Sequence, residues 1–299
     1  PPPPPPPPPF FFQAEDGILD RVASRGLGDV YKRQEKWLPK LASGEVVGTF
    51  ALAEGSGRPS AESLNTRSEA GKLTGKKLPV PDGNIADFAV IVTKSDTGDG
   101  ASLALVELNQ QAVIRSSVRT LDFSRGHASI EFKGAEAEIL GADGSGWSAM
   151  ESLMDRAAVM FAWEQVGIAD AALEQARDYA MGRYAFGRAI ASYQAIKHKL
   201  ADMYVKNTLA RSNCYYGAWA LNSDSSELAL AAATARVGAI QASVNAAQEN
   251  VQTHGGMGFT WEFDCQFFYR RAKLLSVNIG SEGFWQDKLI TAYEQSNVA

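Results

Sequence analysis

Ser148–Met181 reads SAMESLMDRAAVMFAWEQVGIADAALEQARDYAM, and from Val159 onward its apolar residues recur at steps of three and four. This spacing places the apolar side chains on one face of an α-helix. No proline follows Pro81, so no proline interrupts a helix in the rest of the chain. The stretch therefore predicts a long helix that packs its apolar face against other helices.

Three further helices are expected after this one. One helix is expected from Ser192 to Asn222, and a third begins at a capping-box pattern, Asp224–Glu227, and ends at Gly255-Gly256. A last helix is expected over Gly283–Glu294. Long helices joined by short loops pack as an antiparallel up-and-down bundle. Residues 141–299 are therefore predicted to form an all-α four-helix bundle domain.

A different pattern precedes the helices. Over residues 46–140, short strand-like runs alternate with turn sequences such as Asp82-Gly83-Asn84. This pattern predicts a small antiparallel β-sandwich or barrel, so the fold class is α+β with several domains. The expected strands are Val46–Ala53, Ala86–Thr93, Leu103–Leu108, Ala112–Val118 and His127–Phe132.

The first 34 residues are unlike a globular sequence. Residues 1–9 are all proline, and Phe10–Ile18 and Ser24–Gln34 follow. The segment resembles translated sequencing-adapter read-through. The alternative is a disordered proline-rich arm with polyproline II character. We favour the first interpretation, treat residues 1–34 as a non-native head, and begin fold reasoning at Glu35.

Composition excludes several classes of function. The chain has 29 Lys and Arg against 34 Asp and Glu, a net charge of −5, which argues against a nucleic-acid-binding surface. It contains no apolar run long enough for a membrane span and no secretory signal, so the expected location is cytoplasmic. Cys214, Cys265, His127, His198 and His254 are not spaced as a metal site. We expect two buried thiols, packing histidines and no metal.

Three motifs in the helical half carry a family resemblance. Arg183–Ile190, Gln194–Met203 and Gln252–Glu262 resemble, in order, the acyl-CoA dehydrogenase patterns RxxFGxxI, QAIKHxxADM and QxHGGxGFTWE. Upstream, Leu38–Glu45 with Phe50–Glu54 resembles the family's entry into its middle β-domain. The resemblance implies a bacterial branch of the family.

The resemblance begins at Glu35. It therefore implies that residues 35–45 are the remnant of an N-terminal helical domain and that the chain is truncated at its N-terminus.

The resemblance implies that the cofactor is FAD. It places Arg183, Phe186 and Gln194 on the FAD of a neighbouring subunit, and Gln252, Gly255 and Gly256 complete the same dinucleotide site. Chemistry agrees, because arginine presents a charged fork of donors to a pyrophosphate and glycine lets the backbone approach closely. Each residue taken alone has a simpler interpretation: Arg183 could be a solvated charge at a helix end, and Gly255-Gly256 could simply end a helix. The resemblance further implies a homo- or heterotetramer and an electron-transfer partner.

Family chemistry requires a carboxylate base that removes the α-proton of an acyl-CoA thioester. Its main-branch position falls on Ile279, so the usual base is absent. Glu282, Asp155 and Glu164 are the candidate replacements, and Glu164 lies two turns from Ala157, where other branches place the base. We prefer Glu164 to Glu282, because its apolar neighbours would raise its pKa. The alternative for Glu164 is an ion pair with an arginine of the bundle.

The expected activity is FAD-dependent oxidation of an acyl-CoA thioester to the 2,3-enoyl-CoA. The alternative is a non-catalytic structural subunit of a heteromeric acyl-CoA dehydrogenase that contributes to a partner's FAD site. The β-domain departs from the family pattern at three places. The resemblance implies that Ala53 replaces a threonine that contacts the flavin, that Arg58-Pro59 replaces a small polar pair near CoA, and that Leu78–Asp82 replaces a segment that packs on the flavin ring. Val-Pro-Asp at the last of these resembles a bacterial branch, part of which works in heteromeric pairs on bulky substrates such as steroid side-chain thioesters. Both fatty and steroid substrates therefore stay open.

Overall fold

The computed structural model describes residues 27–96 and 100–298. Most of the proline-rich head, residues 1–26, lies outside these ranges. Leu27–Ser43 form helix α1, which starts within the segment set aside above and continues through Pro39. Its end is a Schellman motif, because Gly44 has φ +73° and the N–H groups of Gly44 and Glu45 bond to the carbonyls of Leu41 and Lys40 at 3.2 and 2.9 Å. α1 belongs to a separate compact unit from the one that starts at Val47.

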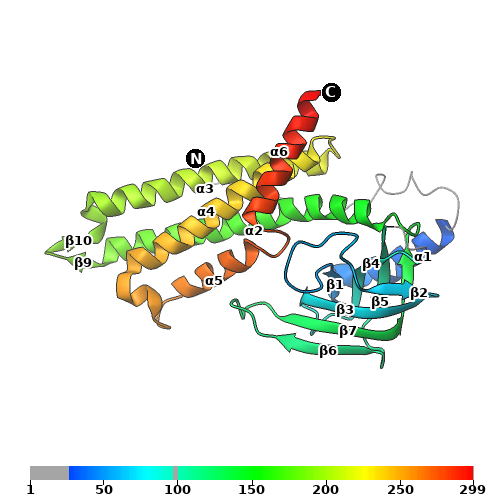
Figure 1. Cartoon of the computed structure of the whole chain (residues 1–299). Helices are drawn as coiled ribbons and strands as arrows, with labels where there is room; N and C mark the ends of the chain where they lie inside the picture. The colour runs from blue at the N-terminus through cyan, green and yellow to red at the C-terminus, as the bar shows by residue number, and fades with distance from the viewer. Residues whose placement is uncertain (1–26, 97–99, 299) are drawn as a thin grey trace. The chain divides into compact units, whose positions relative to one another are not determined.

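The middle region is one sheet with the strand order β6-β7-β3-β2-β4-β5-β8, and β1 pairs with β4 (Figure 1). Most neighbours are antiparallel, as expected, but β4 pairs in parallel with both β1 and β2. The strands are β1 Gly48–Ala51, β2 Arg67–Glu69, β3 Lys72–Pro81, β4 Phe88–Lys94, β5 Ala101–Glu107, β6 Val113–Val118, β7 His127–Glu136 and β8 Glu138–Leu140.

The strands of the sheet share one apolar core, including a strand that the sequence pattern did not predict. β4 and β5 are buried along most of their length, which accounts for their imperfect alternation. β3 was not expected, although Leu73 and Val80 on it are fully buried and pack with Ile91, Ile130 and Phe132. Each of these side chains has almost no exposed area, so the sheet has a continuous core.

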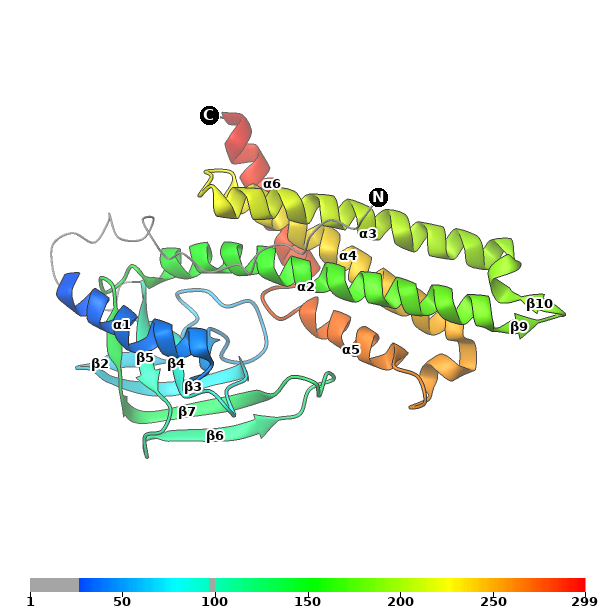
Figure 2. The same ribbon diagram turned by 180° about the vertical axis from the view of Figure 1, so that it is seen from behind.

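The second half of the chain is a bundle of long helices (Figures 1 and 2). Four of its helices match the four expected from the sequence, and α5 is an additional short helix. Between α2 and α3 lie the short strands β9 Tyr184–Ala185 and β10 Arg188–Ala189 and a 3₁₀ turn, Ile190–Ser192. The helices are α2 Gly146–Gly182, α3 Gln194–Asn222, α4 Leu228–His254, α5 Cys265–Leu275 and α6 Glu282–Val298.

Alanine dominates the contact between α2 and α4. The buried cluster here contains Ala162, Ala169, Ala172 and Ala176 of α2 and Ala235, Ala239, Ala242 and Ala246 of α4. Small side chains let the two helix backbones approach closely. α3 joins them at Gly217, where a Cβ atom would lie 3.3 Å from both Ala235 Cβ and a Val159 methyl group. Size, as well as hydrophobicity, therefore sets the spacing of the bundle.

The expectation of two buried thiols is confirmed. Cys214 and Cys265 are both buried free thiols, and burial raises their pKa values to about 12 and about 11. None of the helices in residues 27–96 and 100–298 is both long and apolar enough to cross a membrane.

Candidate flavin and acyl-CoA site

The segment after α2 forms a tight hairpin. β9 and β10 pair through Ala185 and Arg188, and the two residues between them, Phe186 and Gly187, have φ values of +53° and +80°. Positive φ at both central residues is the requirement of a type I′ turn, which normally uses Asn-Gly. An aromatic residue at the first of these positions costs of order 1–3 kcal/mol. Phe186 is also 97% exposed, so the chain holds a large apolar ring outward at a cost in stability.

Arg183 and Gln194 flank this hairpin. Arg183 is the C-cap of α2, and its exposed guanidinium makes no hydrogen bond or ion pair within the described part of the chain. Gln194 is the first residue of α3 and is also exposed. The start of a helix carries partial positive charge on its free N–H groups. A cation, an amide and a helix start therefore lie close together in the sequence, all accessible to an anion.

The second motif lies at the end of α4. Gln252 is exposed in the last turn, and Gly255 caps the helix with φ +59°. A Cβ atom added to Gly255 or Gly256 would meet nothing within 4 Å. The backbone at these two glycines is therefore open to a ligand that packs against it.

An aromatic stack brings the two motifs to the same end of the bundle. The His254 ring, next to Gly255, stacks on Tyr179 with centroids 4.0 Å apart, and Tyr179 lies one turn before Arg183. Both segments lie at this end in the two opposite views (Figures 1 and 2). His254 is 3% exposed and bonds through Nδ1 to the Asn250 carbonyl at 2.9 Å. Burial lowers the pKa of His254, as suits a packing residue.

The main-branch base position is apolar. Ile279 packs in a cluster with Val159, Ile240 and the fully buried Trp285. The segment around it is held by Arg236 of α4, which is fully buried and donates to Leu275 O and to Asn278 Oδ1, the latter at 2.7 Å. Burial lowers the pKa of Arg236 to about 9. No carboxylate occupies this position.

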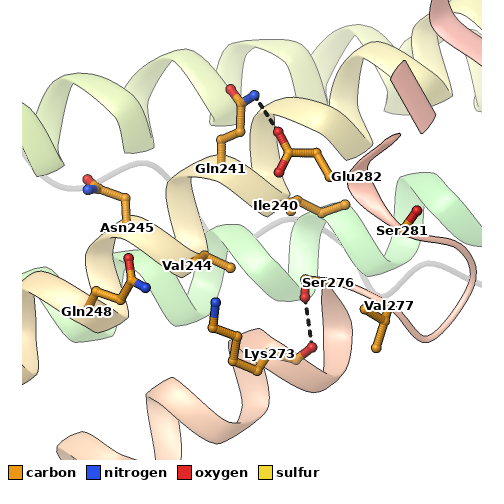
Figure 3. Close-up of a pocket in the computed structure, with 10 residues that line it drawn as sticks. All are labelled: Ile240, Gln241, Val244, Asn245, Gln248, Lys273, Ser276, Val277, Ser281 and Glu282. Carbon is orange, nitrogen blue, oxygen red and sulfur yellow. Dashed lines mark hydrogen bonds between the residues drawn. The ribbon is translucent and has the colours of Figure 1, made fainter. Parts of the chain in front are cut away.

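Glu282 lies at the start of α6, on a cavity of about 410 Å³ between α4 and the end of α5 (Figure 3). Its Oε1 accepts hydrogen bonds from the amides of Gln241 and Gln286 at 2.8 and 3.0 Å. The residues that line the cavity are Ile240, Gln241, Val244, Asn245, Gln248, Lys273, Ser276, Val277, Ser281 and Glu282.

Glu282 faces away from the β-domain. Phe284, two residues later, meets the β-domain residue Arg58, whose guanidinium lies 4.7 Å from the ring centroid. Residues two apart on a helix point in nearly opposite directions, since each residue turns the helix by about 100°. The carboxylate of Glu282 accordingly turns toward Gln241 of α4.

Glu164 occupies the side of α2 that meets α5 and a loop of the β-domain. Arg271 of α5 donates to its Oε1 through Nε at 2.9 Å and Nη2 lies 2.8 Å from the same oxygen. The same arginine reaches Asp122, in the loop between β6 and β7, at 3.2 Å. The alternative that the sequence left open, an ion pair with a bundle arginine, is therefore present, and it engages a single carboxylate oxygen.

Asp155, the third carboxylate considered, is committed elsewhere. It is 8% exposed and pairs with Lys288 of α6 at 2.5 Å. Burial raises the pKa of Asp155, and the lysine only partly offsets this. Its contacts make it a link between α2 and α6.

Two of the β-domain segments that depart from the family pattern, Ala53 and Leu78–Asp82, lie side by side. The N–H of Leu78 donates to the carbonyl of Ala53 at 2.8 Å. Their sequence neighbours, the fully buried Lys77 and Glu54, form an ion pair at 2.7 Å. Asp82, the last residue of Leu78–Asp82, pairs with Arg125 at 2.7 Å.

Comparison with known proteins identifies the family. Residues 144–290 match the model of the acyl-CoA dehydrogenase C-terminal domain. An acyl-CoA dehydrogenase of Bacillus subtilis is 33% identical over 262 residues, which cover 84% of this chain and 69% of the relative. The chain belongs to the acyl-CoA dehydrogenase family.

Two other family members extend the comparison. The acyl-CoA dehydrogenase IpdE2 of Mycobacterium tuberculosis is 32% identical over 239 residues, 79% of this chain and 67% of its own length. The structure of butyryl-CoA dehydrogenase from Megasphaera elsdenii matches with a TM-score of 0.83 at 24% identity, covering 88% of this chain and 72% of that one. The expected fold class is confirmed.

Acyl-CoA dehydrogenases are FAD-dependent oxidoreductases, which confirms the cofactor class and the enzyme class expected from the motifs. The residues of this chain fit FAD. The exposed cation of Arg183, the amides of Gln194 and Gln252 and the open glycine backbone form a donor set suited to a pyrophosphate, and Phe186 offers an aromatic face.

Proposed function

We propose that this chain binds FAD jointly with a second subunit and catalyses the α,β-dehydrogenation of an acyl-CoA thioester. One observation carries the proposal: the Tyr179–His254 stack brings the two FAD motifs together, and their binding groups all face solvent. A strained, exposed Phe186 is difficult to explain in an isolated subunit. A dinucleotide shared between subunits gives it a contact.

The reaction removes a proton from Cα and a hydride from Cβ and leaves a carbon–carbon double bond. Bound FAD supplies the hydride acceptor. Arg183 and Gln252 bind the pyrophosphate, and Glu164 takes the α-proton. Both contacts from Arg271 go to Oε1 of Glu164, so Oε2 is the oxygen that accepts this proton. A positioned base of this kind contributes roughly 10²–10⁴ in rate.

Glu164 is a better candidate for the base than Glu282 because of the direction in which each side chain points. Glu164 is linked through Arg271 to a β-domain loop, whereas Glu282 points to α4. The family resemblance assigns Ala53 and Leu78–Asp82 to the positions of the β-domain that contact the flavin, so the base should lie on the bundle face nearest that domain.

Substitution of each carboxylate tests the assignment. In the FAD-loaded protein, Glu164→Gln should abolish bleaching of the flavin absorbance by acyl-CoA while FAD stays bound, because an amide cannot accept the proton. Glu282→Gln is the matched comparison. Loss of bleaching in Glu282→Gln alone would transfer the role to Glu282.

Normal bleaching in both variants would favour the second candidate function, a structural subunit that completes a partner's FAD site. The apolar packing of Ile279 at the main-branch base position supports this alternative. In either role, a tetramer, an electron-transfer partner and a cytoplasmic location remain part of the proposal. Fatty acyl-CoA and steroid side-chain thioesters are the two substrate classes to compare in the bleaching assay.

A further inference from the structure

The geometry points to Arg271 as a positioning residue that holds Glu164 in register with the flavin-contacting segment of the β-domain, through Asp122 and Arg125. This inference rests on the proposed function, because it assumes that Glu164 is the base. It assigns a role to contacts that the family motifs do not include.

The first link is the contact of one arginine with two carboxylates. Arg271 Nε and Nη2 lie 2.9 and 2.8 Å from Glu164 Oε1, and Nη1 lies 3.2 Å from Asp122 Oδ2. Glu164 and Arg271 are partly exposed, whereas the side chain of Asp122 is only 3% exposed. The fork geometry of a guanidinium lets it bind both groups at once. Asp122 is therefore the fixed end of this link.

Asp122 is held within its own loop. The Ser124 N–H and hydroxyl donate to Asp122 Oδ1 at 2.9 and 2.6 Å, and the Thr120 hydroxyl donates to the Asp122 carbonyl at 2.7 Å. Burial acts to raise the pKa of Asp122, but the bonds from Ser124 and Arg271 outweigh it, so its pKa lies below the usual value. The carboxylate therefore stays charged and keeps its arginine.

The second link joins this loop to the flavin-contacting segment. Arg125 Nε and Nη2 donate to Asp82 Oδ2 at 2.9 and 2.7 Å, and the Asp82 N–H donates to the Gly126 carbonyl at 2.8 Å. Asp82 ends the segment Leu78–Asp82. The loop between β6 and β7 thus holds that segment at one end and Glu164 at the other.

The chain of contacts explains how a carboxylate on the bundle can be aligned with a ring bound on the β-domain. Arg271 fixes Oε1 of Glu164 and so fixes the direction of Oε2. Buried Arg236 on α4 supplies a second positive charge near Glu164. Misplacement of a reacting group by about 1 Å can cost on the order of 10²-fold in rate, so loss of Arg271 should slow proton removal without removing the base.

Two neighbouring arginines allow a matched test. Arg270 also reaches the β6–β7 loop, donating to the Leu121 carbonyl at 2.9 Å, but it contacts no carboxylate of the network. In the FAD-loaded protein, Arg271→Gln should lower kcat for flavin bleaching by roughly 10- to 100-fold, with little change in KM or FAD content. Arg271→Lys should recover part of that loss, and Arg270→Gln should keep the wild-type kcat.

A double-mutant cycle supplies a readout apart from activity. The losses of Tm in Arg271→Gln and Asp122→Asn should be non-additive in the double variant, whereas those of Arg270→Gln and Asp122→Asn should add. Wild-type kcat in Arg271→Gln, an equal loss in Arg270→Gln, or additive Tm losses would overturn the inference. Bleaching by Glu164→Gln would overturn the assignment of the base, whereas an inactive Glu164→Gln beside a fully active Arg271→Gln would overturn only the positioning role.

Discussion

Arg183 and Arg188 lie on either side of the β9–β10 turn but differ in their contacts. Arg188 stacks on Tyr193, with its guanidinium 4.0 Å from the ring centroid, whereas the guanidinium of Arg183 faces solvent and has no partner among the described residues. Arg183→Ala should weaken FAD binding by about 1.5–3 kcal/mol, roughly 10- to 150-fold in Kd, the value of hydrogen bonds to a charged group.

Arg188→Ala is the control for this prediction, since it removes the same charge from the same hairpin. Flavin fluorescence titration measures both variants. Equal affinity in Arg183→Ala and the unmodified protein would exclude Arg183 from the site, and an equal loss in both variants would indicate a general effect of charge.

Individual site residues were predictable where a local motif marks them. Arg183, Phe186 and Gly255 follow from short patterns whose geometry is local. The network around Glu164 was not, because Arg271, which pairs with Glu164, also binds Asp122, which lies 149 residues away in the sequence. The capping box expected at Asp224–Glu227 was wrong: Glu227 is itself the N-cap of α4, and its carboxylate accepts the Tyr216 hydroxyl at 2.6 Å.

At the level of elements, β3 depends on a buried ion pair. Lys77, which is fully buried, donates to Glu54 Oε1 at 2.7 Å and to the Leu52 carbonyl at 3.0 Å, and the N–H groups of Asn65 and Thr66 also donate to Glu54. Burial acts to raise the pKa of Glu54, but these bonds outweigh it and the pKa falls to about 2. The pair thus joins the strand to the segment that contains Ala53.

This pair predicts a loss of stability in acid. Because the pKa of Glu54 is lower in the folded chain than its usual 4.5, its contribution is complete above about pH 4.5 and is lost as the pH falls toward about 2. The contribution is at most about 3 kcal/mol, since burial of Lys77 opposes part of it. Denaturant unfolding at several pH values measures it.

Glu54→Gln should be less stable than the unmodified protein at neutral pH, and its stability should fall less steeply between pH 4.5 and 2. Glu131→Gln, which removes an exposed pair with Lys133, should retain the normal pH dependence. Parallel curves for the Glu54 variant and the unmodified protein would contradict the prediction.

The sequence pattern did not predict β3 because the strand contains residues that are rare in strands. Its sequence, KLTGKKLPVP, has three lysines and two prolines, which are depleted from strands, yet Lys77 is neutralised in the core. The long helices were predictable because their period persists over many turns. α5, with only 11 residues, lies between segments of similar composition and lacks a side-chain cap, so its start was not evident.

At the level of the whole molecule, α3 presents an apolar surface. Val205 and Leu209 lie one turn apart, as do Tyr215 and Trp219, and each is more than half exposed. We expect this face to contact another copy of the chain, so light scattering should give a multiple of 32.2 kDa. Leu209→Glu should lower that mass, because it places a charge in the contact.

Thr291→Glu, an exposed position on α6, adds the same charge elsewhere and should leave the mass unchanged. A monomer in the unmodified protein would contradict this prediction, as would an unchanged mass in Leu209→Glu.

The alanine contact between α2 and α4 limits how this protein can diverge. At Ala169, Ala172, Ala239 and Ala242, a larger side chain would push α2 and α4 apart and shift both ends of the bundle together. The spacing between α2, which carries Glu164, and α4, which ends at Gly255, is therefore set by residues outside the proposed site. We therefore expect residues larger than serine at these positions to destabilise the bundle, and new substrate preferences to arise through changes in the loops.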